Sequence, residues 1–252
     1  KNTKLVFIET PTNPLLELCD IGMISDLCKI NNVCLAIDNT FMSPYGQRPL
    51  ELGADVVMHS ATKSLGGHSD LIAGALVTKD SVLAEKIYFI QKSVGGILSP
   101  FDSWLLLRST KTISLRVQKQ SDNALELAQR LEVLDVIKEV IYPGLHSHSQ
   151  YELACKQQVN PEGNSIFGSM ISIKCGTIEK RNKILSRLKL FTLAESLGGV
   201  ESLVCAPYEM THASVPSGIK ESMGLTRDLI RLSIGVEHIE DLYEDIMNAL
   251  KD

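Results

Sequence analysis

The segment around Lys63 carries the residues best suited to covalent chemistry. A strand-length aliphatic run ends just before Ser60, and Thr62, Lys63, Gly66 and Gly67 follow it. Hydroxyls three and one positions before a lysine can bind phosphate oxygens, while the amine reaches an aldehyde beyond them. A lone lysine is usually a solvated surface residue, so these neighbours are what single this one out. A Gly-rich phosphate loop is excluded, because its glycines would precede the lysine.

A second candidate is Asp38, which ends the aliphatic run Cys34–Ile37. In open α/β sheets, ligands bind beyond the carboxyl ends of the strands. Taken alone, Asp38 is as well explained by a turn or a helix cap. Beside a strand-end lysine it suits a pyridine ring, because a nearby carboxylate favours the protonated ring nitrogen. Together, Asp38 and Lys63 predict a pyridoxal phosphate site.

Arg231 is a third candidate, because it interrupts the apolar run Leu229–Ile234. Burying an unpaired guanidinium is costly, so this one must face a sheet edge, a structural carboxylate or a bound anion. The sequence alone leaves these three alternatives open.

The histidines and cysteines are not assigned to chemistry. We expect structural hydrogen bonds at His59, His68 and His212, and solvated side chains at His146 and His148. The cysteines form no Cys-x-x-Cys pair and mostly lie in apolar segments, so neither a metal site nor a disulfide framework is predicted. They indicate buried thiols in a reducing, cytoplasmic compartment: Cys19, Cys28, Cys34, Cys155, Cys175 and Cys205.

The elements that must position these residues differ between the two parts of the chain. Up to about residue 100, strand-length aliphatic runs alternate with helical patterns, which indicates an α/β sheet covered on both faces. Asp20 is a helix N-cap candidate and Asn31 a stop signal. The expected strands are Leu5–Glu9, Val33–Ile37, Asp55–His59 and Ala73–Thr78.

Beyond Pro100 the pattern changes to that of a separate α+β domain. One long helical region is expected from Phe101 to Leu134, and the last helix over Glu237–Leu250. Strands are expected over Ser165–Ile173 and Asp228–Gly235.

Composition excludes several classes of protein. The 252 residues are 44% hydrophobic and 22% charged, which is too apolar for a disordered chain and enough for a substantial core. The net charge is −5 and no basic stripe is visible, so we expect no nucleic-acid partner. No apolar run approaches the roughly 18–20 residues that span a bilayer, so no membrane role is expected.

Several motifs, in order along the whole chain, resemble the Cys/Met-metabolism family of pyridoxal phosphate enzymes. They are Glu9–Pro14 (ETPTNP), Ile37–Pro44 (IDNTFMSP), Ser60–Lys63 (SATK) with Gly67–Asp70 (GHSD), Ala194–Gly199 (AESLGG), Met210–Ser214 (MTHAS) and Leu229–Gly235 (LIRLSIG). The resemblance implies an aspartate-aminotransferase-like fold of type I. Residues 1–114 would be the C-terminal part of an N-terminally incomplete large cofactor domain. Residues 115–252 would be a linking helix and a smaller α+β domain.

The resemblance also implies a role for each matched residue. Lys63 corresponds to the lysine that binds the cofactor covalently, Asp38 to the partner of its ring nitrogen, and Ser60 and Thr62 to its phosphate ligands. Asn13 corresponds to an asparagine near the cofactor and the substrate carboxylate. Arg231 would clamp that carboxylate, helped by the two hydroxyls of Ser196 and Thr211, and Glu195 occupies a position that correlates with reaction type.

Within the family, the resemblance favours the γ-lyases, which split cystathionine into cysteine, 2-oxobutanoate and ammonia, with hydrogen sulfide release as a side activity. The γ-synthases, which join cysteine to an O-acylhomoserine, are the alternative. The family also has an N-terminal stretch that supplies further cofactor contacts, and this chain opens one step before a strand. We therefore expect a homotetramer completed by that stretch. The remaining alternative is a non-catalytic fragment. Without it, residues 1–110 should expose a large apolar edge.

Overall fold

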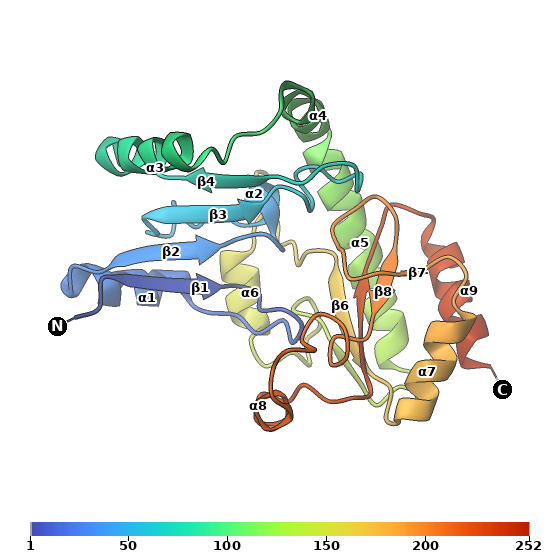
Figure 1. The fold of residues 1–252 in the computed structure, drawn as a ribbon. Coiled ribbons are helices and arrows are strands. Elements are labelled where there is room, and N and C mark those ends of the chain that lie inside the picture. The colour runs from blue at the N-terminus through green and yellow to red at the C-terminus, as the bar shows by residue number, and fades with distance from the viewer. Residues whose placement is uncertain (1, 252) are drawn as a thin grey trace.

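The computed structural model describes residues 2–251, which form two β-sheets with helices around them (Figure 1). The first sheet has the order β1-β2-β3-β4; β1, β2 and β3 run parallel, and β4 pairs antiparallel with β3. Its strands are β1 (Leu5–Glu9), β2 (Cys34–Asp38), β3 (Val56–Ser60) and β4 (Gly74–Val77). All four expected strands are confirmed, with ends shifted by a residue or so.

Helix α1 (Ile21–Ile30) confirms the expected start and stop signals. The Asp20 carboxylate accepts a hydrogen bond from the Met23 amide at 2.9 Å, and Asn31 is the C-cap. The apolar face of α1 packs against β2 around Leu35 and Ile37, which are fully buried. Burial of this face fixes the carboxyl end of β2, where Asp38 lies.

The long helix expected over Phe101–Leu134 is wrong as a single element. The structure has α4 (Pro100–Thr110) and α5 (Ile113–Glu132), separated by Lys111 and Thr112. Each half keeps the helical period, so the pattern gave no sign of a break. The Arg116 side chain stabilises the break, because it reaches back to the Ser109 carbonyl at 2.9 Å.

The second sheet has the order β5-β6-β9-β8-β7, antiparallel except for the pair β7 and β8. Its strands are β5 (Glu139–Ile141), β6 (Met170–Lys174), β7 (Thr192–Leu193), β8 (Leu203–Cys205) and β9 (Leu229–Ser233). The expected Ser165–Ile173 strand is too long at its start, where Ser165 makes only an isolated bridge with Val159. The Asp228–Gly235 strand is confirmed within a residue or two at each end.

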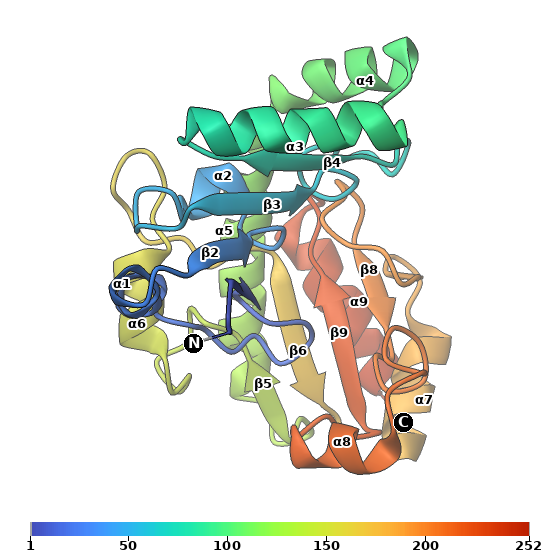
Figure 2. The same ribbon diagram turned by 60° about the vertical axis from the view of Figure 1, so that its left-hand side comes forward.

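The largest core lies between this second sheet and the helices that pack on it. It contains Leu127 and Leu131 of α5, Ile184 of α7 (Ile178–Arg187) and Ile246 of α9 (Ile239–Leu250), all nearly fully buried. Figure 2 shows α9 behind β9 and α5 running from this core to the first sheet. The short helices are α2 (Ser43–Gly46), α6 (Tyr151–Gln157) and α8 (Ser217–Ser222).

The first sheet is less covered than expected. Helix α3 (Ser81–Val94) lies beyond β4 (Figure 2) and contributes no buried residue. Leu5 and Phe7 of β1 are more than half exposed. The expected exposed apolar surface on the first part of the chain is therefore present. None of the helices among residues 2–251 combines the length and apolar character needed to cross a membrane.

Candidate functional site

The carboxyl ends of β1, β2 and β3 bring three polar residues to one edge of the first sheet. Glu9 pairs in register with Asp38, so their side chains lie on the same face of neighbouring parallel strands. Thr40 links the ends of β2 and β3. Its amide donates to Asp38 Oδ1 at 2.9 Å, and its hydroxyl accepts from the Ser60 amide at 2.8 Å. Asp38 and Ser60 thus lie close together at this edge.

Lys63 follows β3 in a tight turn, in which its amide donates to the Ser60 carbonyl at 3.1 Å. Its amine donates to Ser196 Oγ at 3.5 Å, although 133 positions separate the two residues. Burial lowers the pKa of the Lys63 amine, and the positive charge of Arg231 lowers it further. Both causes favour the neutral amine, which is the form that attacks carbonyl groups and accepts protons.

Thr62 is engaged with the start of β4. Its hydroxyl donates to the Ala73 carbonyl at 3.2 Å and accepts from the Ala73 amide at 3.0 Å. To donate to a phosphate, the Thr62 hydroxyl would have to exchange its bond to the Ala73 carbonyl.

Arg231 lies in the central strand β9 and is only 2% exposed. One terminal nitrogen donates to Asn13 Oδ1 at 2.8 Å, and the other to the carbonyls of Glu195 at 2.8 Å and Ser196 at 3.3 Å. These acceptors are neutral, and Nε has no partner. A sheet edge is therefore excluded, and no carboxylate among residues 2–251 forms an ion pair with Arg231. Such a guanidinium favours an anion at this point.

Two of the expected site residues are tied less directly to the others. The Glu195 side chain is exposed, and only its backbone contacts Arg231. The Thr211 hydroxyl is hydrogen bonded to His212 Nδ1 at 2.8 Å. His212 in turn interacts with the Asn13 backbone, and burial lowers the pKa of its ring.

Glu9 is a residue of this site that the sequence analysis did not select. Burial raises the pKa of Glu9 to about 7, and the negative charge of Asp38 adds to that rise. The Asn13 backbone amide and Arg231 act in the opposite direction. Its place as the last residue of the first expected strand was the available signal, because parallel neighbours end at the same sheet edge.

The segment Ala194–Gly199 joins the two sheets at Lys63. Gly198 has a φ of +74°, and a Cβ there would lie 2.9 Å from the Ser64 nitrogen. The Gly198 amide also donates to Ser233 Oγ of β9 at 2.8 Å. Only glycine allows the backbone at position 198 to lie this close to the Ser64 backbone. The glycine of the Ala194–Gly199 motif is therefore explained by its contact with the Lys63 turn.

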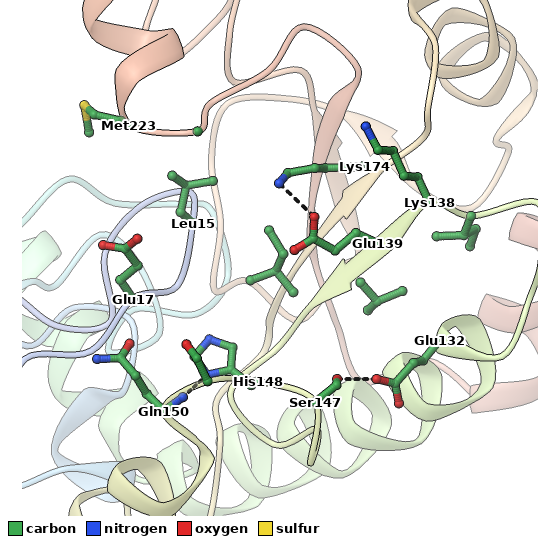
Figure 3. A pocket seen from close by; sticks show the side chains of 15 residues that line it. Leu15, Glu17, Glu132, Lys138, Glu139, Ser147, His148, Gln150, Lys174 and Met223 are labelled. Carbon is green, nitrogen blue, oxygen red and sulfur yellow. Dashed lines mark hydrogen bonds and ion pairs between the residues drawn. The ribbon is translucent and has the colours of Figure 1, made fainter.

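Two of the cavities in the described part of the chain differ in their relation to the candidate site. A cavity of about 560 Å³ between the Leu15 loop, β5 and α8 is lined by Glu17, Lys138 and His148 and contains none of the expected site residues (Figure 3). A second, of about 780 Å³, lies between β3, β4 and α3 and includes Ser60 in its lining.

Comparison with known proteins decides the family. The family model of the Cys/Met metabolism PLP-dependent enzymes, which describes the sequences of that family, matches residues 1–251 of this chain. The chain belongs to this family. Its members depend on pyridoxal phosphate (PLP), so the cofactor inferred from Lys63 and Asp38 is confirmed at the level of the family.

The relatives carry several names. The chain is 49% identical over 251 residues to a cystathionine γ-lyase of Bacillus subtilis, covering 100% of this chain and 65% of that protein. It is 48% identical to a cystathionine β-lyase of Lactococcus lactis subsp. cremoris, covering 100% of this chain and 64% of that protein. A solved cystathionine γ-synthase of Xanthomonas oryzae pv. oryzae, in complex with cystathionine, is 40% identical with a TM-score of 0.93, over 98% of this chain and 62% of that one.

The expected fold of type I is thereby confirmed, and the chain spans somewhat less than two thirds of the length of these relatives. The residues present fit the cofactor that the family uses. The half-buried Lys63 amine suits an aldehyde, the strand-end carboxylate of Asp38 suits a ring nitrogen, and the Ser60 hydroxyl suits a phosphate. Thr62 would join Ser60 once its hydroxyl exchanges the bond to Ala73. Arg231 with its free Nε remains available for a further anionic group.

Proposed function

We propose that the protein cleaves cystathionine by γ-elimination, giving cysteine, 2-oxobutanoate and ammonia. The observation that supports this most is the position of Arg231: a buried guanidinium with neutral acceptors and a free Nε, beside the residue that meets the Lys63 amine. A substrate carboxylate bound there would be held close to that amine. We assign this clamp to Arg231, assisted by Asn13, Ser196 and Thr211.

The proposed cofactor contacts follow the sheet edge. Lys63 would hold PLP covalently, Asp38 would face its ring nitrogen, and Ser60, Thr62 and Asn13 would contact its phosphate and ring substituents. Bound PLP supplies an electron sink for charge that develops at the substrate α-carbon.

Lys63 is the proposed proton carrier. Its lowered pKa leaves a larger fraction of neutral amine near pH 7, and its long flexible side chain can take a proton at one carbon and release it at another. Ser196 Oγ, at 3.5 Å, would steady the amine between these positions. Loss of a β-proton then expels the γ-thiolate, which leaves as cysteine when the substrate is cystathionine.

The relatives do not agree on the reaction class, since their names include γ-lyase, β-lyase and γ-synthase. We favour γ-chemistry over β-elimination because of the Ala194–Gly199 motif with Glu195, and γ-elimination within it because of the motifs that begin at Met210 (MTHASVP) and Gly235 (GVEHIEDL). The second candidate is γ-replacement on an O-acylhomoserine by cysteine. A release of hydrogen sulfide would be a side activity.

The whole protein is proposed to be a cytoplasmic homotetramer. Residues 1–114 would belong to its large cofactor domain, and residues 115–252 would form the linking helix and the smaller domain. The exposed apolar side chains of α3 and α4 support burial against a further segment or another subunit. A sulfur amino acid is the proposed substrate.

The test compares two assays on the purified full-length protein. We expect 2-oxobutanoate from cystathionine, and little product from O-acylhomoserine plus cysteine. Lys63→Ala should abolish both the visible absorbance of bound PLP and the cleavage, whereas Lys79→Ala, a change at an exposed loop lysine, should retain them. Inertness toward cystathionine with strong γ-replacement would overturn the choice of reaction. A protein without bound PLP and without either activity would support the non-catalytic reading.

A further inference from the structure

Arg116 of α5 reaches the turn that carries Lys63. The side chain is 6% exposed, and its terminal nitrogens donate to the Ser64 carbonyl at 2.7 Å and the Leu65 carbonyl at 3.4 Å. Arg116 is thus bonded to the two residues directly after Lys63, although about 50 positions separate them along the chain.

The turn has carbonyl groups that need such a partner. Its internal bonds run from the Lys63 amide to the Ser60 carbonyl, from the Gly66 amide to the Ala61 carbonyl and from the Gly67 amide to the Lys63 carbonyl. Within residues 2–251, no backbone amide donates to the carbonyls of Ser64 or Leu65. Free carbonyls at the end of a helical turn attract a cation, and buried ones are costly if left unpaired.

The guanidinium is itself anchored at the break between α4 and α5. Its Nε donates to Thr112 Oγ1 at 3.1 Å, and a terminal nitrogen donates to the Ser109 carbonyl at 2.9 Å. No carboxylate in the described part of the chain pairs with it. One rigid planar group therefore connects the helix break to the Lys63 turn, which the single amine of a lysine cannot reproduce.

Gly67 keeps the space for this guanidinium. A Cβ at Gly67, whose φ is +70°, would lie 1.9 Å from Arg116 Nη1. On the other side, the Gly67 carbonyl accepts the Val200 amide at 2.9 Å. The turn is consequently held between α5 and the segment that carries Ser196.

We propose that Arg116 is a positioning residue that holds the Lys63 turn rigid, so that the Lys63 amine stays beside Ser196 Oγ. The catalytic part of this inference rests on the proposed function of Lys63. The rigidity of the turn does not, and it can be measured separately.

The test uses hydrogen exchange and steady-state kinetics on the full-length holoenzyme. In Arg116→Met we expect amide exchange over residues 60–70 to be at least about tenfold faster, with a partial effect in Arg116→Lys. We expect kcat to fall about 10- to 100-fold while KM stays within about threefold. Arg130 lies on the surface of the same helix and pairs with Glu240. Arg130→Met removes this cation and should change neither the amide exchange over residues 60–70 nor kcat.

A milder variant keeps the test valid if Arg116→Met does not fold. Thr112→Val removes the acceptor of Nε and the hydroxyl's own bond to the Ser109 carbonyl, but leaves the Arg116 guanidinium in place; it should raise exchange over residues 60–70 by roughly threefold. Unchanged exchange in these variants would overturn the proposal, as would faster exchange with unchanged kcat. If exchange responds as expected but wild-type Lys63 carries no PLP, the proposed function fails and the catalytic part of this inference fails with it.

Discussion

At the scale of single residues, the candidate site depends on groups whose usual partners are missing. Arg231 is buried with neutral acceptors, and Glu9 ends its strand beside a second carboxylate, Asp38. Both arrangements are unfavourable for the stability of the fold. Both become favourable when an anion and a cationic ring are bound, which is why we place ligand binding here.

The Arg231 clamp predicts a loss of substrate binding on conservative substitution. Arg231→Lys keeps the charge but removes the planar pair of donors. We expect kcat/KM for cystathionine to fall about 100-fold, equivalent to about 2.7 kcal/mol, mainly through KM. Arg187→Lys, at an exposed position on α7, should have no effect. An unchanged KM in Arg231→Lys would exclude the clamp.

Glu9 predicts a pH dependence of stability. Its carboxyl titrates near the ordinary value of 4.5 in the unfolded chain and at about 7 in the folded one. Between these values the folded state holds the extra proton, so the free energy of unfolding falls as the pH rises from 4.5 to about 7. In Glu9→Gln this fall is absent.

Denaturation of the cofactor-free protein by urea measures this effect. We expect Glu9→Gln to be more stable than the wild type by on the order of 1–2 kcal/mol above neutral pH, and nearly equal to it in acid, where both side chains are neutral. Parallel pH curves for the two proteins would contradict the assignment.

At the scale of elements, strands and helix caps were predictable because their signals are local. The aliphatic runs gave all four strands of the first sheet, and Asp20 marked the start of α1. The break between α4 and α5 was missed, because the helical period continues on both sides of it and the Arg116 side chain that bonds Ser109 and Thr112 is held by tertiary hydrogen bonds to Ser64 and Leu65. Likewise, Lys63 and Asp38 stood out by their neighbours, whereas the contact of Arg231 with Asn13 joins residues 218 positions apart and has no local pattern.

Gly198 gives a prediction for the element that joins the sheets. Gly198→Ala places a Cβ against the Ser64 backbone and strains a left-handed φ. We expect a loss of about 1–2 kcal/mol in stability and a lower kcat, since Ser196 is carried by the same segment. Gly218→Ala, where an added Cβ meets nothing within 4 Å, is the matched control. Equal stability of the two variants would contradict the close approach.

At the scale of the whole molecule, apolar surface remains on one side. Helices α3 and α4 and the segment between them carry large apolar side chains that are each more than half exposed: Tyr88, Phe89, Ile90, Val94, Ile97, Phe101, Trp104 and Leu107. Such a surface is typical of an interface.

We therefore expect the 252-residue chain, produced alone, to self-associate with increasing concentration in analytical ultracentrifugation. Phe89→Ser should weaken this association, whereas Val133→Ser, an equally exposed side chain at the far end of α5, should not. A stable monomer at high concentration would show that this surface is not an interface between copies of this chain.

The central claim is that Lys63 holds the cofactor, and one measurement tests it most directly. The full-length holoprotein is reduced with borohydride, digested and analysed by peptide mass spectrometry. We predict a phosphopyridoxyl group on Lys63 and on no other lysine. A label on a different lysine, or none on a protein that contains PLP, would contradict the assignment of this site.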